Sequence, residues 1–270
     1  MHMEAFAQGF VPGVPRIAYR EAGRGAPVIF MHGIGGNSRN WVEQMPAVAE
    51  HFHAIAWDAR GYGDSEDYEG ELRFPTFGHD LSRLLDHLGV PAAHLVGLSM
   101  GGRIALDFYE QSPSRVLSLS LVDTFAGYDD SFTPAAREKF IELRRKPLLE
   151  GKEPRDIAPV VAQTLVSSRA SPAHIAALID SMSRLHKFSY IKTIEAMTRY
   201  ERVADLSKVH VPTLVVVGDQ DRLTPPSVAR EMTAAIAGAE LAIIRNAGHL
   251  ANIEQPALFN AILLDFLLRL

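Results

Sequence analysis

The sequence predicts an α/β fold in which a mostly parallel, doubly wound sheet carries an inserted helical cap. Two observations support this prediction: short apolar runs alternate with helical patterns, and the alternation stops between about residues 124 and 205. Near-continuous apolar runs are typical of parallel strands that helices cover on both faces. We therefore expect a core at 1–123 and 206–270, with a helical cap at 124–205.

The elements follow in order along the chain. An antiparallel strand is expected at 16–21, where polar and apolar residues alternate before a glycine-rich turn. Six buried strands are then expected at 28–31, 54–57, 94–98, 117–122, 213–217 and 241–244. A helix at 103–111 follows the third of these strands. The last helix shows apolar residues at helical spacing, namely Phe259, Ile262, Leu263, Phe266, Leu267 and Leu270.

The cap contains two signals for the start of a helix. Thr133 precedes Pro134 and Ser171 precedes Pro172, and each pair places an N-cap residue before proline at the first helical position. The cap is also rich in large apolar side chains. We expect most of them to pack between helices and a few to face an apolar acyl pocket: Phe125, Phe132, Phe140, Met182, Phe188, Tyr190, Met197 and Tyr200.

The composition argues against several classes of function. The 270 residues are 47% hydrophobic and carry a net charge of −5, without a long run of either sign. This composition predicts neither a nucleic-acid footprint nor a polybasic membrane anchor. There is no cysteine, so disulfides and thiolate metal sites are excluded. No secretory signal or membrane-helix run is visible, so we expect a cytoplasmic protein, either a monomer or a homo-oligomer.

A serine nucleophile is expected at Ser99. The segment Gly97-Leu98-Ser99-Met100-Gly101 matches the pattern G-x-S-x-G, in which a sharp strand-to-helix turn lifts a serine hydroxyl clear of the backbone. The strand at 94–98 and the helix at 103–111 supply that context. The glycines are needed because a Cβ at either position would clash with neighbouring backbone.

His249 is the expected general base, since a serine hydroxyl is a poor nucleophile on its own. Of the eleven histidines, it alone lies in a Gly-flanked loop directly after a late strand. His32 also follows a strand, but its place before Gly33 favours a role in anchoring the loop. The other histidines show no ligand spacing, so no metal site is expected.

Asp221 is the acid expected to orient His249. It lies in Gly218-Asp219-Gln220-Asp221, after the strand at 213–217, and the order Ser, Asp, His is the one this elbow type uses. Asp219 is expected at the surface or in a turn. Asp123, which directly follows the strand at 117–122, is the serious alternative acid.

Acyl transfer also needs donors for the oxyanion, each contributing about 2.7–4 kcal/mol. One is expected to be the backbone N–H of Met100, at the N-terminus of the elbow helix. The other is expected to be the Ile34 N–H, in the Gly-rich loop 32–36. A third polar loop, at 58–65, contains Asp58 and Arg60, which we interpret as loop-organising residues joined by hydrogen bonds rather than as an acid–base pair.

Together these motifs resemble those of the α/β-hydrolase superfamily over essentially the whole chain. They are His-Gly-Ile-Gly-Gly at 32–36, Asp-Ala-Arg-Gly-Tyr-Gly-Asp-Ser at 58–65, Gly-Leu-Ser-Met-Gly-Gly at 97–102 and Gly-Asp-Gln-Asp at 218–221. The tail at 247–256, continuing to Phe259-Asn260, is similar to 3-oxoadipate enol-lactonases and related small esterases. The resemblance implies a cofactor-free serine hydrolase with the α/β-hydrolase fold, which cleaves a carboxylic ester or lactone through an acyl-enzyme.

Two alternatives stay open. Carbon–carbon bond hydrolases of meta-cleavage pathways share this architecture, but commonly carry an aromatic residue after the catalytic histidine, where this chain has Leu250. Their usual proline is also missing from the loop 32–36. The other alternative is a non-enzymatic small-molecule receptor on the same scaffold. Relatives that use an aspartate nucleophile are disfavoured by Ser99.

Overall fold

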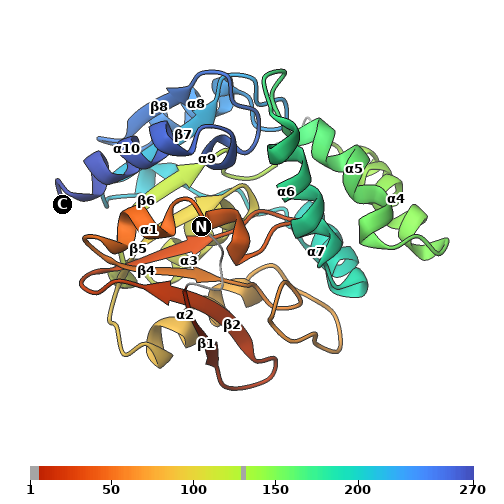
Figure 1. Cartoon of the computed structure of the whole chain (residues 1–270), viewed down its shortest axis with the longest axis horizontal. Helices are drawn as coiled ribbons and strands as arrows, with labels where there is room; N and C mark the ends of the chain where they lie inside the picture. The colour runs from red at the N-terminus through yellow and green to blue at the C-terminus, as the bar shows by residue number, and fades with distance from the viewer. Residues whose placement is uncertain (1–5, 129–131) are drawn as a thin grey trace.

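An eight-stranded sheet forms the centre of the protein, in a computed structural model that describes residues 6–128 and 132–270 (Figure 1). The strands are β1 (Ala7–Val11), β2 (Ile17–Ala22), β3 (Pro27–Met31), β4 (His53–Trp57), β5 (Ala93–Leu98), β6 (Val116–Val122), β7 (Thr213–Gly218) and β8 (Glu240–Ile244). Their order is β1-β2-β4-β3-β5-β6-β7-β8. β2 pairs antiparallel with β1 and β4, and the strands from β4 to β8 are parallel. The predicted fold class is confirmed.

The predicted strands correspond to β2 through β8 with shifts of one residue or so at their ends. Strand β1 was not predicted, because Gln8 and Gly9 interrupt its apolar pattern. Gly9 is needed there for space: a Cβ at this position would lie 2.2 Å from the ring of Tyr19 on β2. The Tyr19 ring lies directly over the Gly9 backbone, where only a residue without a side chain leaves it room.

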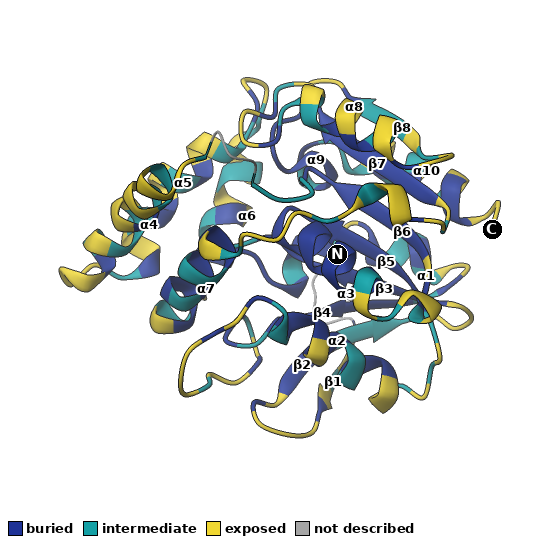
Figure 2. Cartoon of the chain, turned by 180° about the vertical axis from the view of Figure 1, so that it is seen from behind, coloured by how far each residue is buried: buried dark blue, intermediate teal, exposed yellow. Residues whose placement is uncertain are grey.

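Helices cover both faces of the sheet. On one face lie α2 (Thr76–His87), α3 (Met100–Gln111) and α8 (Pro226–Ala235), and on the other lie α1 (Met45–Ala49) and α10 (Pro256–Leu267). Strand β3 contributes to both cores, because Ile29 and Met31 pack on one face while Val28 and Phe30 pack on the other. Figure 2 shows the central strands buried, which explains why they are almost wholly apolar in sequence.

Four further helices come between β6 and β7 and gather beside the sheet (Figure 1): α4 (Pro134–Leu149), α5 (Pro154–Leu165), α6 (Pro172–Ser183) and α7 (Lys187–Arg199). Both predicted helix starts are confirmed. Thr133 Oγ1 accepts a hydrogen bond from Ala136 N at 3.3 Å, and Ser171 Oγ accepts one from His174 N at 3.3 Å. Between β6 and β7, the residues that the structure describes form no strand.

Short elements complete the chain. They are η2 (Ser38–Trp41), η3 (Pro113–Arg115), η4 (Leu206–Lys208) and α9 (Ala251–Glu254). Two of them matter for the site: η2 follows the loop after β3, and α9 follows the loop after β8. Within 6–128 and 132–270, no helix combines the length and apolar character needed to cross a membrane.

Candidate active site

Ser99 occupies a strained turn between β5 and α3. Its φ of 53° and ψ of −112° lie in a region that non-glycine residues rarely adopt. Both flanking glycines are required, as predicted: a Cβ on Gly97 would lie 2.4 Å from the Gly101 backbone, and one on Gly101 would lie 2.2 Å from Met31 O. Thr124 Oγ1 donates a 2.6 Å hydrogen bond to Ser99 O and holds the turn from β6.

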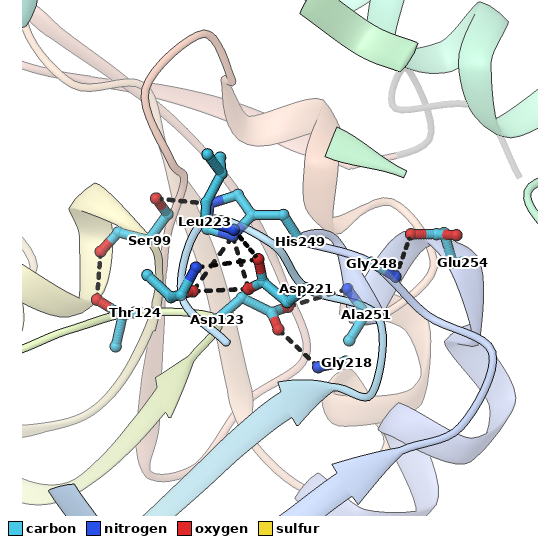
Figure 3. A network of polar contacts seen from close by, with 11 residues as sticks. Ser99, Asp123, Thr124, Gly218, Asp221, Leu223, Gly248, His249, Ala251 and Glu254 are labelled. Carbon is cyan, nitrogen blue, oxygen red and sulfur yellow. Dashed lines mark hydrogen bonds and ion pairs between the residues drawn. The ribbon is translucent and has the colours of Figure 1, made fainter. Parts of the chain in front are cut away.

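The structure brings Ser99, His249 and Asp221 together in one chain of hydrogen bonds (Figure 3). His249 Nδ1 lies 2.8 Å from Asp221 Oδ2, and His249 Nε2 lies 2.9 Å from Ser99 Oγ. Because the Asp221 carboxylate only accepts, Nδ1 carries the proton. Nε2 is therefore left to accept the hydrogen bond of the serine hydroxyl.

Hydrogen bonds from its own loop fix the Asp221 carboxylate. Oδ1 accepts from Leu223 N at 2.8 Å and from Thr224 N at 3.1 Å, and Oδ2 accepts from Thr224 Oγ1 at 2.6 Å. Sequence analysis missed Thr224; its position three residues after the acid is the local signal that could have identified it. Asp219, expected at the surface, is exposed.

Asp123, the alternative acid, has a different environment. It is fully buried at the end of β6 with a φ of 43°, and its carboxylate accepts from Gly218 N at 2.8 Å and Ala251 N at 3.0 Å. These two amides flank the loops that carry Asp221 and His249, at the end of β7 and the start of α9. The carboxylate therefore ties the acid loop to the base loop, while Asp221 binds the imidazole directly.

A second buried carboxylate, that of Glu254 on α9, supports the base loop. Its Oε1 accepts from Gly248 N at 2.8 Å, and its Oε2 accepts from Ser167 N at 2.9 Å, just beyond α5. His249 N donates to Leu165 O at 2.7 Å. Glu254 was also missed from the sequence, since no fixed spacing relates it to a segment 87 residues away.

The charges around His249 suit a general base. Burial alone would lower its pKa, but the hydrogen bond and charge of Asp221, with the charge of Asp123, raise it above the usual 6.5. Burial would raise the pKa of Asp221, yet the bonds from His249 and Thr224 hold it below its usual range. Burial and the neighbouring Asp221 raise the pKa of Asp123 to about 7.

His32 anchors the loop after β3, as expected. Its Nε2 accepts from Ala59 N at 3.1 Å, and its Nδ1 donates to Gly33 O at 2.8 Å. Burial lowers the pKa of His32 to about 4, so the ring stays neutral near pH 7. A neutral imidazole both donates and accepts, which these two contacts require.

Asp58 and Arg60 organise the neighbouring loops, but not by bonding to each other. Asp58 accepts from Ser38 N at 2.6 Å and from Asp64 N at 2.9 Å. Arg60 instead binds the buried Asp80 of α2 through two contacts of 2.6 and 2.8 Å. The sequence interpretation was therefore wrong about the pairing, because α2 supplies a closer and fully buried partner for the guanidinium.

The two expected oxyanion donors lie on either side of Ser99. A Cβ on Gly33 would lie 3.2 Å from Ser99 Cβ, so the loop that carries Ile34 runs directly beside the serine. Met100 is the first residue of α3, where backbone N–H groups have no partner within the helix. Among the hydrogen bonds of the described residues, neither the Ile34 nor the Met100 N–H has an acceptor.

A small chamber of about 30 Å³ adjoins this loop. Glycines 33, 35 and 36 form one wall, and apolar residues form most of the rest: Ile34, Leu98, Leu165, Leu178, Met182 and Leu250. Asn40 and Ser181 are its polar members, and none of the described lining residues is charged. By volume it holds about two water molecules, which is the size of a short apolar group. Met182 is thus one of the cap side chains that face a pocket.

No metal centre accompanies these groups within the described part of the chain. His, Asp and Glu side chains there do not gather in threes as possible ligands. The polar atoms of the site bind one another and backbone amides instead. What the arrangement offers chemically is an activated hydroxyl, a proton acceptor beside it and two free amide donors.

A strand–elbow–helix with this acid and base order defines a hydrolase of the α/β class. The chain belongs to the alpha/beta hydrolase fold family, whose model matches residues 26–256. A thermophilic esterase from Thermogutta terrifontis is a structural neighbour, with a TM-score of 0.89 and 27% identity over 97% of this chain and 98% of that one. The resemblance noted from the sequence is therefore confirmed at the level of the superfamily.

Curated relatives act on different substrates. The chain is 30% identical over 268 residues to the 2-hydroxy-6-oxononadienedioate/2-hydroxy-6-oxononatrienedioate hydrolase of Escherichia coli, covering 94% of this chain and 91% of that protein. It is 27% identical over 234 residues to 3-oxoadipate enol-lactonase 2 of Acinetobacter baylyi, covering 86% and 85%. It also matches the dihydrolipoyllysine-residue acetyltransferase component of the acetoin cleaving system from Cupriavidus necator, of whose length it spans only 65%.

Proposed function

We propose that this hydrolase cleaves a carboxylic ester or lactone through an acyl-enzyme. Ser99 Oγ attacks the carbonyl carbon while His249 Nε2 takes the hydroxyl proton, and the Ile34 and Met100 amides bind the oxyanion. The C–O bond then breaks, and the leaving alkoxide takes the proton from Nε2. Water attacks the acyl-enzyme in the same way, which releases the acid and restores Ser99.

The observation that carries this proposal is the hydrogen-bond chain from Asp221 to His249 to Ser99, at 2.8 and 2.9 Å. The distances lie within the range that proton transfer requires. The raised pKa of His249 supports the same role, because it favours the imidazolium that forms during the reaction.

The direct test is hydrolysis of p-nitrophenyl acetate and butyrate by the wild type and by Ser99→Ala. The variant is expected to lose at least about 10⁴-fold in kcat, since it lacks the nucleophile. Circular dichroism should show an unchanged fold. Full turnover in the variant would end the proposed mechanism.

The chamber favours an ester or lactone over a dioate substrate such as that of the E. coli relative. A buried carboxylate needs a cation or several donors, and no charged side chain lines the described chamber wall. A carbon–carbon bond hydrolase remains the second candidate because that relative is similar over 94% of this chain. A panel of vinylogous diketone dienoates beside the p-nitrophenyl esters separates the two: higher kcat/KM on the dienoates would select the second candidate.

A further inference from the structure

A larger pocket of about 360 Å³ lies next to the chamber, between η2, α6 and α9. The two cavities differ in character. The chamber walls are mostly apolar, whereas the outer pocket is lined by charged side chains that include Arg39, Glu43 and Asp180. Asn40 and Ser181 line both cavities, so these two residues stand between them.

Hydrogen bonds between the core and the cap run across this boundary. Ser181 Oγ, on α6, accepts from Asn37 Nδ2 at 3.1 Å and lies 3.5 Å from Asn40 Nδ2. Asn37 Nδ2 also lies 3.4 Å from Ser181 O. Asn40 is itself held by Asn37 N, which donates to its Oδ1 at 3.0 Å. All three side chains are buried. We call the contact of Asn37, Asn40 and Ser181 the partition.

We propose that Ser181 determines the length of the substrate that this enzyme accepts. The partition closes the chamber, so the arm of the ester that enters it, either the acyl or the alkyl chain, must be short and uncharged. The inference rests on the proposed ester hydrolysis. A longer arm would have to cross the partition into the outer pocket, and in doing so it would break the bonds to Ser181 Oγ. An arm that ends within the chamber leaves these bonds intact and contacts mostly apolar side chains and glycine backbone.

Ser181→Gly tests the proposal because it removes the hydroxyl and the Cβ from the boundary. Asn37 Nδ2 keeps its contact with Ser181 O, so the loop retains a partner. Ser181→Leu is the opposite change, since it adds apolar volume to the same wall. Ser183→Gly is the control: it places glycine at an exposed position of the same helix, where the hydroxyl bonds to Ile179 O at 2.6 Å and not to the core.

The measurement is kcat/KM over two series, p-nitrophenyl acetate to octanoate and ethyl to hexyl acetate. In the wild type we expect kcat/KM to fall by about tenfold or more at the first substrate whose chain is too long for the chamber. This is the usual effect of extra methylene groups in a fitted pocket. Ser181→Gly should raise the ratio of kcat/KM for long substrates to kcat/KM for short substrates by about tenfold in one of the two series. The series that responds shows whether the chamber holds the acyl or the alkyl arm of the ester. Ser181→Leu should lower the ratio of butyrate to acetate or of butyl to ethyl ester.

Three outcomes would overturn the inference. Unchanged ratios in both series for Ser181→Gly would show that the partition does not set length. Equal changes in Ser181→Gly and Ser183→Gly would assign the effect to loosening of α6. A wild-type enzyme that hydrolyses no ester would remove the proposed function, and this inference with it, whereas normal hydrolysis with unchanged ratios would remove the inference alone.

Discussion

The loops that carry Asp221 and His249 and the outer helices of the cap are held in place by different kinds of contact. On the sheet side, the buried Asp123 carboxylate binds two backbone amides, those of Gly218 and Ala251. On the cap side, α4 and α7 are joined by ion pairs such as Arg199–Glu138, whose side chains are about half exposed. Exposed pairs add little stability, whereas a buried amide that loses its acceptor is costly. The sheet side therefore holds Asp221 and His249 in place, whereas the outer cap helices α4 and α7 can vary with little effect on these two residues.

After removal of the Ser99 hydroxyl itself, the largest loss is expected from Asp221→Asn. An amide in place of the carboxylate no longer holds the His249 tautomer that accepts from Ser99, so kcat on p-nitrophenyl acetate should fall by about 10⁴-fold. The exposed Asp219, two residues away, provides the control Asp219→Asn, which should keep wild-type turnover. If Asp123→Asn abolished turnover and Asp221→Asn did not, Asp123 would be the catalytic acid.

The pH profile of the wild type tests whether His249 acts as the general base beside Asp221. His249 must be unprotonated to act as a base, and its pKa is raised above 6.5 by Asp221 and Asp123 despite burial. We therefore expect kcat/KM to fall about tenfold per pH unit as the pH drops below this raised pKa. An acid limb well below pH 6.5 would contradict the charge arrangement around the imidazole.

The burial of His32 should make the folded protein less stable at acid pH. Its pKa is about 4 in the folded protein because of burial and about 6.5 in an unfolded chain, so the unfolded state binds the proton first. Above pH 6.5 His32 therefore does not lower the free energy of unfolding, and as the pH drops towards 4 this free energy should fall by about 3 kcal/mol. Urea unfolding at several pH values should show that His32→Gln lacks this component, while exposed His51→Gln retains it.

Asp123→Asn should destabilise the protein more than it slows the reaction. One of the two amides, that of Gly218 or Ala251, would face an NH₂ group and lose its acceptor, which costs about 1–3 kcal/mol. We expect a lower urea midpoint, with kcat reduced far less than in Asp221→Asn. A midpoint equal to that of the wild type would show that the two amide bonds do not stabilise the loops.

The smallest effect is expected in the cap. Ser171→Ala and Thr133→Ala each remove one N-cap bond, from α6 and α4 respectively, and each should cost about 1 kcal/mol. Of these two helices, α6 borders the chamber and α4 does not, so Ser171→Ala should raise KM for a p-nitrophenyl ester and Thr133→Ala should not. Similar KM values for the two variants would argue against a special role for α6.

The two sides also differed in what the sequence could predict. Ser99, His249 and Asp221 each follow an apolar run at the carboxyl end of a strand, and parallel strands bring such ends to one edge. Thr124, Glu254 and Ser181 could not be found in this way, because their partners lie in segments with no fixed spacing from them. The starts of α4 and α6 could be predicted from their N-caps, but the face that α6 turns to the chamber depends on tertiary packing.

The contacts beyond α5 have a mechanical consequence. Glu254 joins Ser167 to Gly248, and His249 N binds Leu165 O, so the end of α5 and the base loop form one unit. The two segments pack closely at Gly248, since a Cβ there would lie 2.6 Å from Leu165 O. An outward movement of α5 would therefore break the bonds of Leu165 O and Ser167 N to the segment that holds the imidazole beside Ser99.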